Sequence, residues 1–488
     1  MLTHRDALLR RLVLSVPAPA PVERRGTRVG DVELSAPPVA LRADGWTDAR
    51  VLVRLHGQPV AEIDLDLGAG PVTTADVEEL LLARGDDVLR DHLRLDGIER
   101  PGQEPPLGVG RHRCLEALDP TAPRPTVSVV IPTRDRADLL VTCLDSVLAV
   151  RYPALEVVVV DNAPADDSTR AVVRERFGDD PRVRYVRLDR AGASHARNVG
   201  ARLARGEIVA FTDDDALVDE LWVAALVAGF ADDPRIVCVT GLTLAGSLET
   251  PAAQAFEAYG GMGLGLRPRL YDRDEHRGDT LLYPYTAGVF GASNNVAFRR
   301  GDFLARGGFD VTIGPGTAVF GAEDLDLFLA VVLDGQRIAY EPAATVRHEH
   351  RADFADLYWQ VFTYSAGFTA LLTKWALADP RVALDLARRV PRVLPAALLA
   401  SHRSGAEAGV GDYPAQLRWL ERAGYLYGPL AYLRSRIDLL RGRTAASAPR
   451  GVAPSVRATF PAPASAAPAL SRTAGTGGAP GSRPDGPP

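Results

Sequence analysis

Residues 206–215 read GEIVAFTDDD, an apolar run that ends directly in three carboxylates, Asp213, Asp214 and Asp215. It is the last of four short apolar runs that are typical of buried strands, at 127–131, 155–160, 183–188 and 207–212. Segments of helical periodicity separate them, at 136–150, 167–177 and 194–205. The second run, LEVVVV, is apolar at nearly every position, as in a strand buried on both faces. This alternation predicts an α/β fold with a mostly parallel, doubly wound sheet that carries helices on both faces.

Polar residues follow three of these strands, at the edge where an open parallel sheet binds its ligands. Pro132 and Thr133 follow the first strand, Asp161 the second, and the three aspartates the fourth. Adjacent carboxylates repel one another unless a cation neutralises them. On an extended segment Asp213 and Asp215 share a face, with Asp214 turned aside. Because carboxylate oxygens suit Mg²⁺ or Mn²⁺, the triplet is a candidate metal site, and a solvated acidic loop is the alternative.

Two further groups of residues could carry chemistry. Glu323 and Asp324 stand in GAEDLDLF, where the apolar residues that follow predict the start of a helix. Acidic residues are stabilising in a first helical turn, so helix capping is the alternative to a catalytic role. His348 and His350 follow an apolar strand in VRHEH, and one of them could reach the crevice as a metal ligand.

The 488 residues are 46% hydrophobic and 24% charged, which excludes a wholly disordered chain or a collagen. A net charge of −6 argues against a dedicated nucleic-acid binder, and three cysteines are too few for a disulfide framework. The first residues lack the apolar core of a signal peptide, and no run approaches the length of a membrane span. We therefore expect a cytoplasmic protein.

The chain divides into four zones. Residues 1–120 form an expected accessory α+β region, with a hairpin from 49–55 and 60–67 and one helix at 74–95. Residues 125–350 form the α/β domain, and residues 351–443 predict helices. Residues 444–488 contain 27 Pro, Ala or Gly and cannot bury enough apolar surface to fold, so they are expected to be a disordered tail.

Seven segments of the α/β zone occur in an order and spacing typical of one enzyme family: VSVVIPTRDR, VVVVDN, GASHARNVGARLARGEIVAFTDDD, GASNNVAFRR, GGFD, GAEDLDLF and YEPAATVRHEH. The set, from about residue 126 to 352, strongly resembles glycosyltransferase family 2 enzymes with the Rossmann-like GT-A fold. The resemblance implies an inverting transferase of the hexosyl or deoxyhexosyl class. It would move a sugar from a nucleoside-diphosphate sugar to a hydroxyl of a carbohydrate or lipid-linked acceptor, with Mn²⁺ or Mg²⁺. Synthesis of cell-envelope polysaccharide, exopolysaccharide or glycolipid would be its setting.

The same resemblance implies roles for individual residues. Those expected at the nucleotide sugar are Pro132, Thr133, Asp161, Arg197, Asn198, Asp213 and Asp214. Those expected at the metal are Asp213, Asp215 and His348, with His350 as the alternative histidine. Glu323 and Asp324 match the catalytic motif, in which the aspartate is the base. Arg134-Asp135-Arg136 departs from the family pattern, where tyrosine and asparagine are more usual.

Other hypotheses stay open. A sugar nucleotidyltransferase would carry a glycine-rich loop where this chain has PTRDR, and a non-catalytic scaffold would not need the acidic motifs. The helices at 351–443 could cover the catalytic domain or lie on the inner face of a membrane as a peripheral contact. Arg388, Arg389, Arg392 and Trp375 are the residues that suggest the membrane contact.

Overall fold

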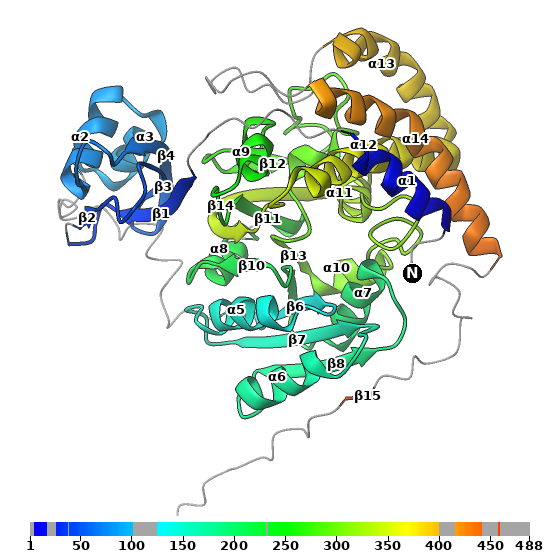
Figure 1. The fold of residues 1–488 in the computed structure, drawn as a ribbon, viewed down its shortest axis with the longest axis horizontal. Coiled ribbons are helices and arrows are strands. Elements are labelled where there is room, and N and C mark those ends of the chain that lie inside the picture. The colour runs from blue at the N-terminus through cyan, green and yellow to red at the C-terminus, as the bar shows by residue number, and fades with distance from the viewer. Residues whose placement is uncertain are drawn as a thin grey trace, which may run out of the picture.

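The computed structural model describes residues 4–16, 26–37, 39–100, 124–230, 233–399, 415–441 and 457–458. Its centre is a ten-stranded sheet in the order β10-β14-β11-β13-β9-β6-β7-β8-β15, with β12 paired to β14 (Figure 1). The tail expected at 444–488, apart from β15 (Arg457–Ala458), and the last part of the expected accessory region lie outside the described residues.

The four strands expected from the apolar runs form the parallel half of this sheet. They are β6 (Val127–Thr133), β7 (Leu155–Asn162), β8 (Val183–Leu188) and β9 (Ile208–Phe211). β6 pairs in parallel with β7 and β9, and β7 pairs in parallel with β8. The helices expected between them are α5 (Ala137–Leu148), α6 (Ser168–Phe177) and α7 (Ala193–Leu203). The predicted α/β class and its parallel strands are confirmed.

Each face of the sheet has its own hydrophobic core. Val129 and Val157 pack on one face, in a cluster that includes residues of α5, α6 and α8 (Trp222–Gly229). Their neighbours Val130 and Val158 pack on the other face with residues of α7 and α11 (Glu323–Leu333). Because successive side chains of a strand point to opposite faces, strands covered on both faces must be apolar throughout.

The second half of the sheet contains antiparallel pairs. Its strands are β10 (Ala216–Val218), β11 (Ile236–Ala245), β12 (Arg269–Tyr271), β13 (Val296–Arg299) and β14 (Arg337–His348). β13 lies antiparallel to both β9 and β11 and so joins the two halves, whereas β11 and β14 are parallel. Short helices connect these strands: α9 (Pro251–Ala258), the 3₁₀ turn η1 (Ala287–Phe290) and α10 (Arg300–Ala305).

A small sheet near the N-terminus contains the predicted hairpin. β3 (Asp48–Leu55) pairs antiparallel with β4 (Gln58–Asp66), and β1 (Thr27–Glu33) lies parallel to β3. β2 (Ala40–Leu41) and β5 (Val72–Thr73) form a separate two-stranded pair.

The prediction of one helix at 74–95 is wrong, because two helices occupy this stretch: α2 (Thr74–Arg84) and α3 (Asp87–Asp96). Gly85 ends α2 with a left-handed φ of 65°, which glycine adopts without strain. The Asp86 side chain then caps α3 by accepting hydrogen bonds from the backbone N–H groups of Val88 and Leu89.

The expected C-terminal helices are present as α12 (Phe354–Ala378), α13 (Pro380–Leu399) and α14 (Ala415–Leu440). α1 (His4–Leu14) packs with them and not with the small sheet, since Val13 shares a core with Leu357 and Leu417 (Figure 1). Among the described residues, no helix has the length and apolarity needed to cross a membrane.

Candidate active site

The three aspartates lie in the turn between β9 and β10, and their side chains diverge. Asp213 and Asp215 converge with His348 on one point, where the three ligand atoms lie within 4.8 Å of one another. Asp214 turns the other way and accepts a hydrogen bond of 2.7 Å from the Thr133 hydroxyl. Burial raises the pKa of Asp214 to about 6, although the Thr133 hydrogen bond opposes that rise.

His348 reaches this turn because of strand pairing. In the antiparallel register of β10 and β14, Ala216 lies opposite His348, which puts the imidazole beside the preceding residue, Asp215. The distance between His348 Nε2 and Asp215 Oδ1 is 3.1 Å. His350 is directed elsewhere, since its Nε2 lies 2.6 Å from Glu257 Oε1 on α9. Of the two histidines, His348 is therefore the one at the carboxylates.

The charges of His348 and Asp215 shift each other's pKa. Burial alone would raise the pKa of Asp215, but the hydrogen bond and charge of His348, together with Arg136, lower it below its ordinary value. Burial likewise opposes the protonation of His348, whereas the Asp215 and Asp213 carboxylates raise its pKa above the ordinary value.

Arg197, on α7, connects the metal-site candidates to α11. Its guanidinium donates to Asp213 Oδ1 at 2.6 Å and to Glu323 Oε1 at 2.9 Å, and its side chain is only 5% exposed. Glu323 is equally buried. Its burial and the neighbouring Asp324 charge raise its pKa to about 7, against the opposing effect of Arg197.

Asp324 is the second residue of α11 and has a fixed orientation. Its Oδ2 accepts a hydrogen bond of 2.9 Å from the backbone N–H of Ser293, and its Oδ1 accepts one of 2.8 Å from the N–H of Leu325. Ala322, the residue before α11, has a left-handed φ of 75°, so the chain turns sharply into the helix at this point. The carboxylate is therefore held by two backbone donors at a helix N-terminus, where the helix dipole favours negative charge.

The ends of β6 and β7 contribute Pro132, Thr133 and Asp161. Thr133 lies opposite Asp161 in the strand register and joins it to the Asp214 side of the crevice. Asp161 is fully buried, and its Oδ2 accepts a hydrogen bond of 2.6 Å from the Tyr185 hydroxyl. Among the residues that the structure describes, its Oδ1 has no hydrogen-bond partner. Burial raises the pKa of Asp161 to about 6 despite the Tyr185 hydrogen bond.

The Asn198 side chain binds the backbone of a loop that lies far from it in sequence. Its Nδ2 donates to the carbonyl of Phe309 at 2.8 Å, and its Oδ1 accepts from the Phe309 N–H at 2.9 Å. The amide is buried and clamps the GGFD segment onto α7. This geometry gives Asn198 a positioning contact with a loop, and its expected contact with the nucleotide stays a prediction.

Several residues of the site were not identified from the sequence. Arg136 contacts Asp214 at 3.2 Å and Asp215 at 2.9 Å, and its side chain is 42% exposed. Arg136 belongs to the Arg134-Asp135-Arg136 stretch that departs from the family pattern. That departure was the only feature of the sequence that pointed to Arg136. Cys143 lies beneath the turn and its Sγ contacts the Asp213 carbonyl at 3.3 Å. The Ser293 contribution is a backbone N–H, which no side-chain pattern reveals.

The donor set fits a hard divalent cation. Two carboxylates and one imidazole are ligands that Mn²⁺ accepts, and the three ligand atoms already converge. Arg136 and Arg197 partly neutralise the same carboxylates from either side. Asp213, whose side chain is 27% exposed, is the most open member of the cluster.

Parts of this chain are similar in sequence to known proteins. The model of glycosyl transferase family 2 matches residues 128–292. A glucosyl-dolichyl phosphate glucuronosyltransferase of Haloferax volcanii is 30% identical over 245 residues, which are 48% of this chain and 73% of that protein. A pre-mycofactocin glycosyltransferase of Mycobacterium tuberculosis is 28% identical over 241 residues, 47% of this chain and 44% of that protein. The chain therefore spans less than half of this second relative.

Solved structures align with about two thirds of the chain. A mannosyltransferase of Pyrobaculum calidifontis, in complex with GDP-Man and Mn²⁺, has a TM-score of 0.41 at 22% identity and covers 66% of this chain and 89% of that one. Residues 1–349 of S. aureus TarS have a TM-score of 0.38 at 16% identity and cover 69% of this chain and 97% of that one. Sequence carries the assignment: with the family model matched across β6 to η1 and a relative aligned over most of its length, the chain belongs to glycosyl transferase family 2.

Proposed function

We propose that this chain is an inverting, metal-dependent glycosyltransferase with Asp324 as its catalytic base. As a family 2 enzyme it transfers a sugar from a nucleotide sugar. The inverting mechanism, the dependence on a metal and the role of Asp324 are what we propose. The single observation that supports it best is Arg197, which joins Asp213 of the candidate metal cluster to Glu323, beside Asp324. A leaving-group site and a base on one rigid network are what a single displacement at an anomeric carbon requires.

Asp213, Asp215 and His348 would hold the divalent cation. When bound, Mn²⁺ or Mg²⁺ would supply positive charge to the diphosphate leaving group. Arg136 is exposed at the same crevice and could pair with a phosphate oxygen through its planar guanidinium. Arg197, by contrast, is almost fully buried between two carboxylates, and we assign it the positioning of Asp213 and Glu323.

The nucleoside would bind along the ends of β6 and β7. The Oδ1 of Asp161 is a buried acceptor with no partner in the described part of the chain, so a donor N–H or O–H of a nucleobase or ribose would satisfy it. Thr133 and Pro132 would line the same side, and Asp214 would face the ribose. The nucleobase at the end of β7 and the metal ion beyond the end of β9 would then lie on either side of β6.

Asp324 would act on the acceptor. Its carboxylate takes the proton of the acceptor hydroxyl as that oxygen attacks the anomeric carbon. The new carbon–oxygen bond forms on the face opposite the breaking bond to the diphosphate, so the configuration inverts. The two backbone hydrogen bonds fix the carboxylate before substrate binds, which lowers the cost of organising the transition state.

The experiment combines turnover with binding. Asp324→Asn keeps the size of the side chain and one of its two acceptor oxygens but cannot take a proton, so we expect kcat to fall by about 100-fold or more. Thermal stabilisation by UDP, GDP or dTDP with Mn²⁺ should persist, because the nucleotide site is intact. Asp279→Asn, at an exposed position, is the matched control. Wild-type turnover in Asp324→Asn would exclude this base, and a product with retained anomeric configuration would exclude single displacement.

The acceptor is proposed to be a growing saccharide or a lipid-linked sugar of cell-envelope, exopolysaccharide or glycolipid synthesis. The similarity to an enzyme named for a glucosyl-dolichyl phosphate supports the lipid-linked class. Such an acceptor would bring the protein to a membrane as a peripheral enzyme. Retention of both acidic clusters, with their buried arginine, favours this catalytic role over a scaffold.

A further inference from the structure

A second cluster of ligand-type side chains lies far from the crevice, in the small N-terminal unit. His56 forms the turn between β3 and β4 with a left-handed φ of 54°, while His92 and Asp96 lie one turn apart on α3. Their side chains are 11%, 14% and 6% exposed. Two elements distant in sequence therefore direct three metal-binding groups at one buried point.

The distances within this cluster have the size of a metal coordination shell. His56 Nδ1 lies 3.2 Å and His92 Nε2 lies 3.0 Å from Asp96 Oδ2, and the two nitrogens are 3.3 Å apart. A tetrahedral zinc ion with bonds of about 2.0–2.1 Å holds its ligand atoms about 3.3 Å apart. The three atoms therefore match one face of a zinc tetrahedron.

Proton positions alone do not explain this arrangement well. A neutral imidazole carries one N–H, and each of these two nitrogens faces both the same carboxylate oxygen and the other nitrogen. If both nitrogens carry hydrogens, the hydrogens crowd together at one oxygen. If one does not, its lone pair faces the carboxylate lone pairs. A cation among the three atoms removes this conflict, since each atom then offers a lone pair.

The cluster is also held in place from outside. Glu33 accepts hydrogen bonds from the backbone N–H of His56 at 3.0 Å and of Gly57 at 2.8 Å, which fixes the turn. Asp86 caps the start of α3. Such supporting contacts orient ligands before a metal binds.

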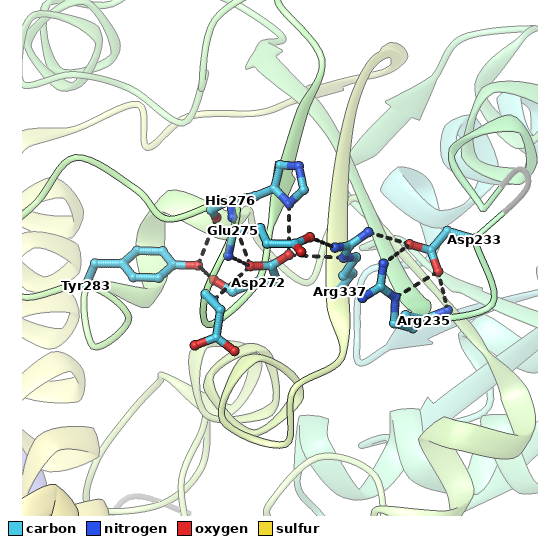
Figure 2. A network of polar contacts seen from close by, with 8 residues as sticks. Asp233, Arg235, Asp272, Glu275, His276, Tyr283 and Arg337 are labelled. Carbon is cyan, nitrogen blue, oxygen red and sulfur yellow. Dashed lines mark hydrogen bonds and ion pairs between the residues drawn. The ribbon is translucent and has the colours of Figure 1, made fainter.

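A third ligand-type cluster provides the contrast. Asp272, Glu275 and His276 also converge, but Arg337 lies among them and ion-pairs with both acids (Figure 2). The guanidinium Nε is 3.0 Å from Asp272 Oδ2, and Nη1 is 2.6 Å from Asp233. This cluster already contains its cation, so we assign it no metal.

We propose that His56, His92 and Asp96 bind a structural Zn²⁺ ion. Two imidazoles and a carboxylate are a common zinc ligand set, and water or a further side chain completes four-coordination. The ion would join the β3–β4 turn to α3. That turn contacts the catalytic unit, since Gly57 packs on Leu221 and Arg54 ion-pairs with Asp219 at 3.1 Å.

The test measures zinc in the full chain with the catalytic cluster disabled by Asp215→Asn. We expect about one zinc ion per chain after extensive dialysis, and a lower melting temperature after chelation that added Zn²⁺ restores. His92→Gln should weaken zinc binding by at least about tenfold. His276→Ala, in the arginine-filled cluster, is the matched control and should retain zinc.

A second readout distinguishes loss of the metal site from misfolding of the variant. Co²⁺ added to the metal-free protein should give the visible absorption of a tetrahedral site in the Asp215→Asn background, and His56→Gln should remove it without loss of circular dichroism. The proposal is overturned if the wild-type ligands retain no zinc and Zn²⁺ leaves the melting temperature unchanged. It is also overturned if folded His92→Gln and His56→Gln proteins retain zinc as tightly as their parent.

Discussion

Glu323 interacts with charged groups on both sides, Arg197 and Asp324. It is buried between Arg197, which donates to it, and Asp324, whose charge helps to raise its pKa to about 7. Because the same guanidinium also holds Asp213, the metal-site candidate and the first turn of α11 are fixed by one side chain. A change at any one of these residues therefore changes the electrostatic setting of the others.

Asp161 predicts a pH-dependent stability. Its pKa is raised from the ordinary 3.8 to about 6 by burial, so the folded state holds this proton more tightly than the unfolded state. The resulting stabilisation is full below pH 3.8 and is lost as pH rises through 6. Asp161→Asn has no charge to bury, so at pH 8 it should exceed the wild type in unfolding free energy by up to about 3 kcal/mol.

Urea denaturation at pH 5 and pH 8 measures this difference, which should be smaller at pH 5. The variant should also lose most of its stabilisation by a nucleotide, since Asp161 is proposed to receive a donor group of the nucleoside. Asp279→Asn, on the surface, should behave as the wild type at both pH values. An Asp161→Asn protein no more stable than the wild type at pH 8 would contradict the burial argument.

At this scale the sequence identified residue types but not their partners. Carboxylates after apolar strands were expected to gather, and Asp213, Asp215 and Asp161 do lie at strand ends. The choice between His348 and His350 depends on the β10–β14 register, and the role of Asn198 depends on a loop from another part of the chain. Such contacts join residues that are far apart in sequence, so they cannot be predicted from local sequence patterns.

At the scale of elements, α12 holds α11 in place. Lys374, the only lysine of the chain, lies 2.5 Å from Asp310 and 2.6 Å from Asp326. The neighbouring Trp375 donates its indole N–H to Asp326 at 2.9 Å. Asp326 lies in the first turn of α11 together with Glu323 and Asp324. The contacts of Asp326 with Lys374 and Trp375 therefore also fix the end of α11 that forms the site.

Lys374→Met should destabilise the protein strongly. The methionine keeps the apolar length of the side chain but leaves Asp310 and Asp326 without their cation, in a partly buried position. Removing one partner of such a network costs about 3 kcal/mol or more. Urea denaturation at pH 7 measures the loss, and kcat should fall because the first turn of α11 is less well held.

Two further variants check the cause. Lys374→Arg keeps the charge and should lose much less stability. Adding Asp326→Asn to Lys374→Met removes one of the uncompensated carboxylates and should recover part of the loss. Equal stability of Lys374→Met and the wild type would mean that this ion pair does not hold the helix.

Elements themselves were well predicted where the pattern was strong. The four parallel strands and their three helices follow from apolar runs and helical periodicity, and the hairpin from alternation around a turn. β13 was not predicted, because four residues give too short a pattern to distinguish a strand, and its antiparallel place between β9 and β11 is a tertiary choice. The break at Gly85 was missed because helical periodicity continues across it.

At the scale of the whole molecule, α14 presents an unusual apolar stripe. Trp419, Leu426, Leu430, Leu433, Ile437 and Leu440 are all exposed, and Leu426 and Leu440 are 80% and 82% exposed. From Leu426 onward the spacing alternates between four and three residues, so these side chains lie along one helix face. Arg436 is exposed on the same helix, and Arg441, directly after its last residue, is exposed too. An apolar helix face with arginines beside it is suited to an anionic lipid surface.

We therefore predict that the full chain floats with vesicles containing anionic lipid and that Leu426→Ser with Leu430→Ser weakens this binding by about tenfold or more. High salt should weaken it too, because the arginines contribute through screened charges. Leu139→Ser with Leu217→Ser, which removes two exposed leucines outside α14, is the matched control and should float as the wild type. The stripe could instead bind a second copy of the chain, and mass measurement by light scattering tests this alternative. If the wild type is a dimer that does not bind vesicles, and the α14 variant is a monomer, the face belongs to a dimer interface. That result would contradict the membrane contact.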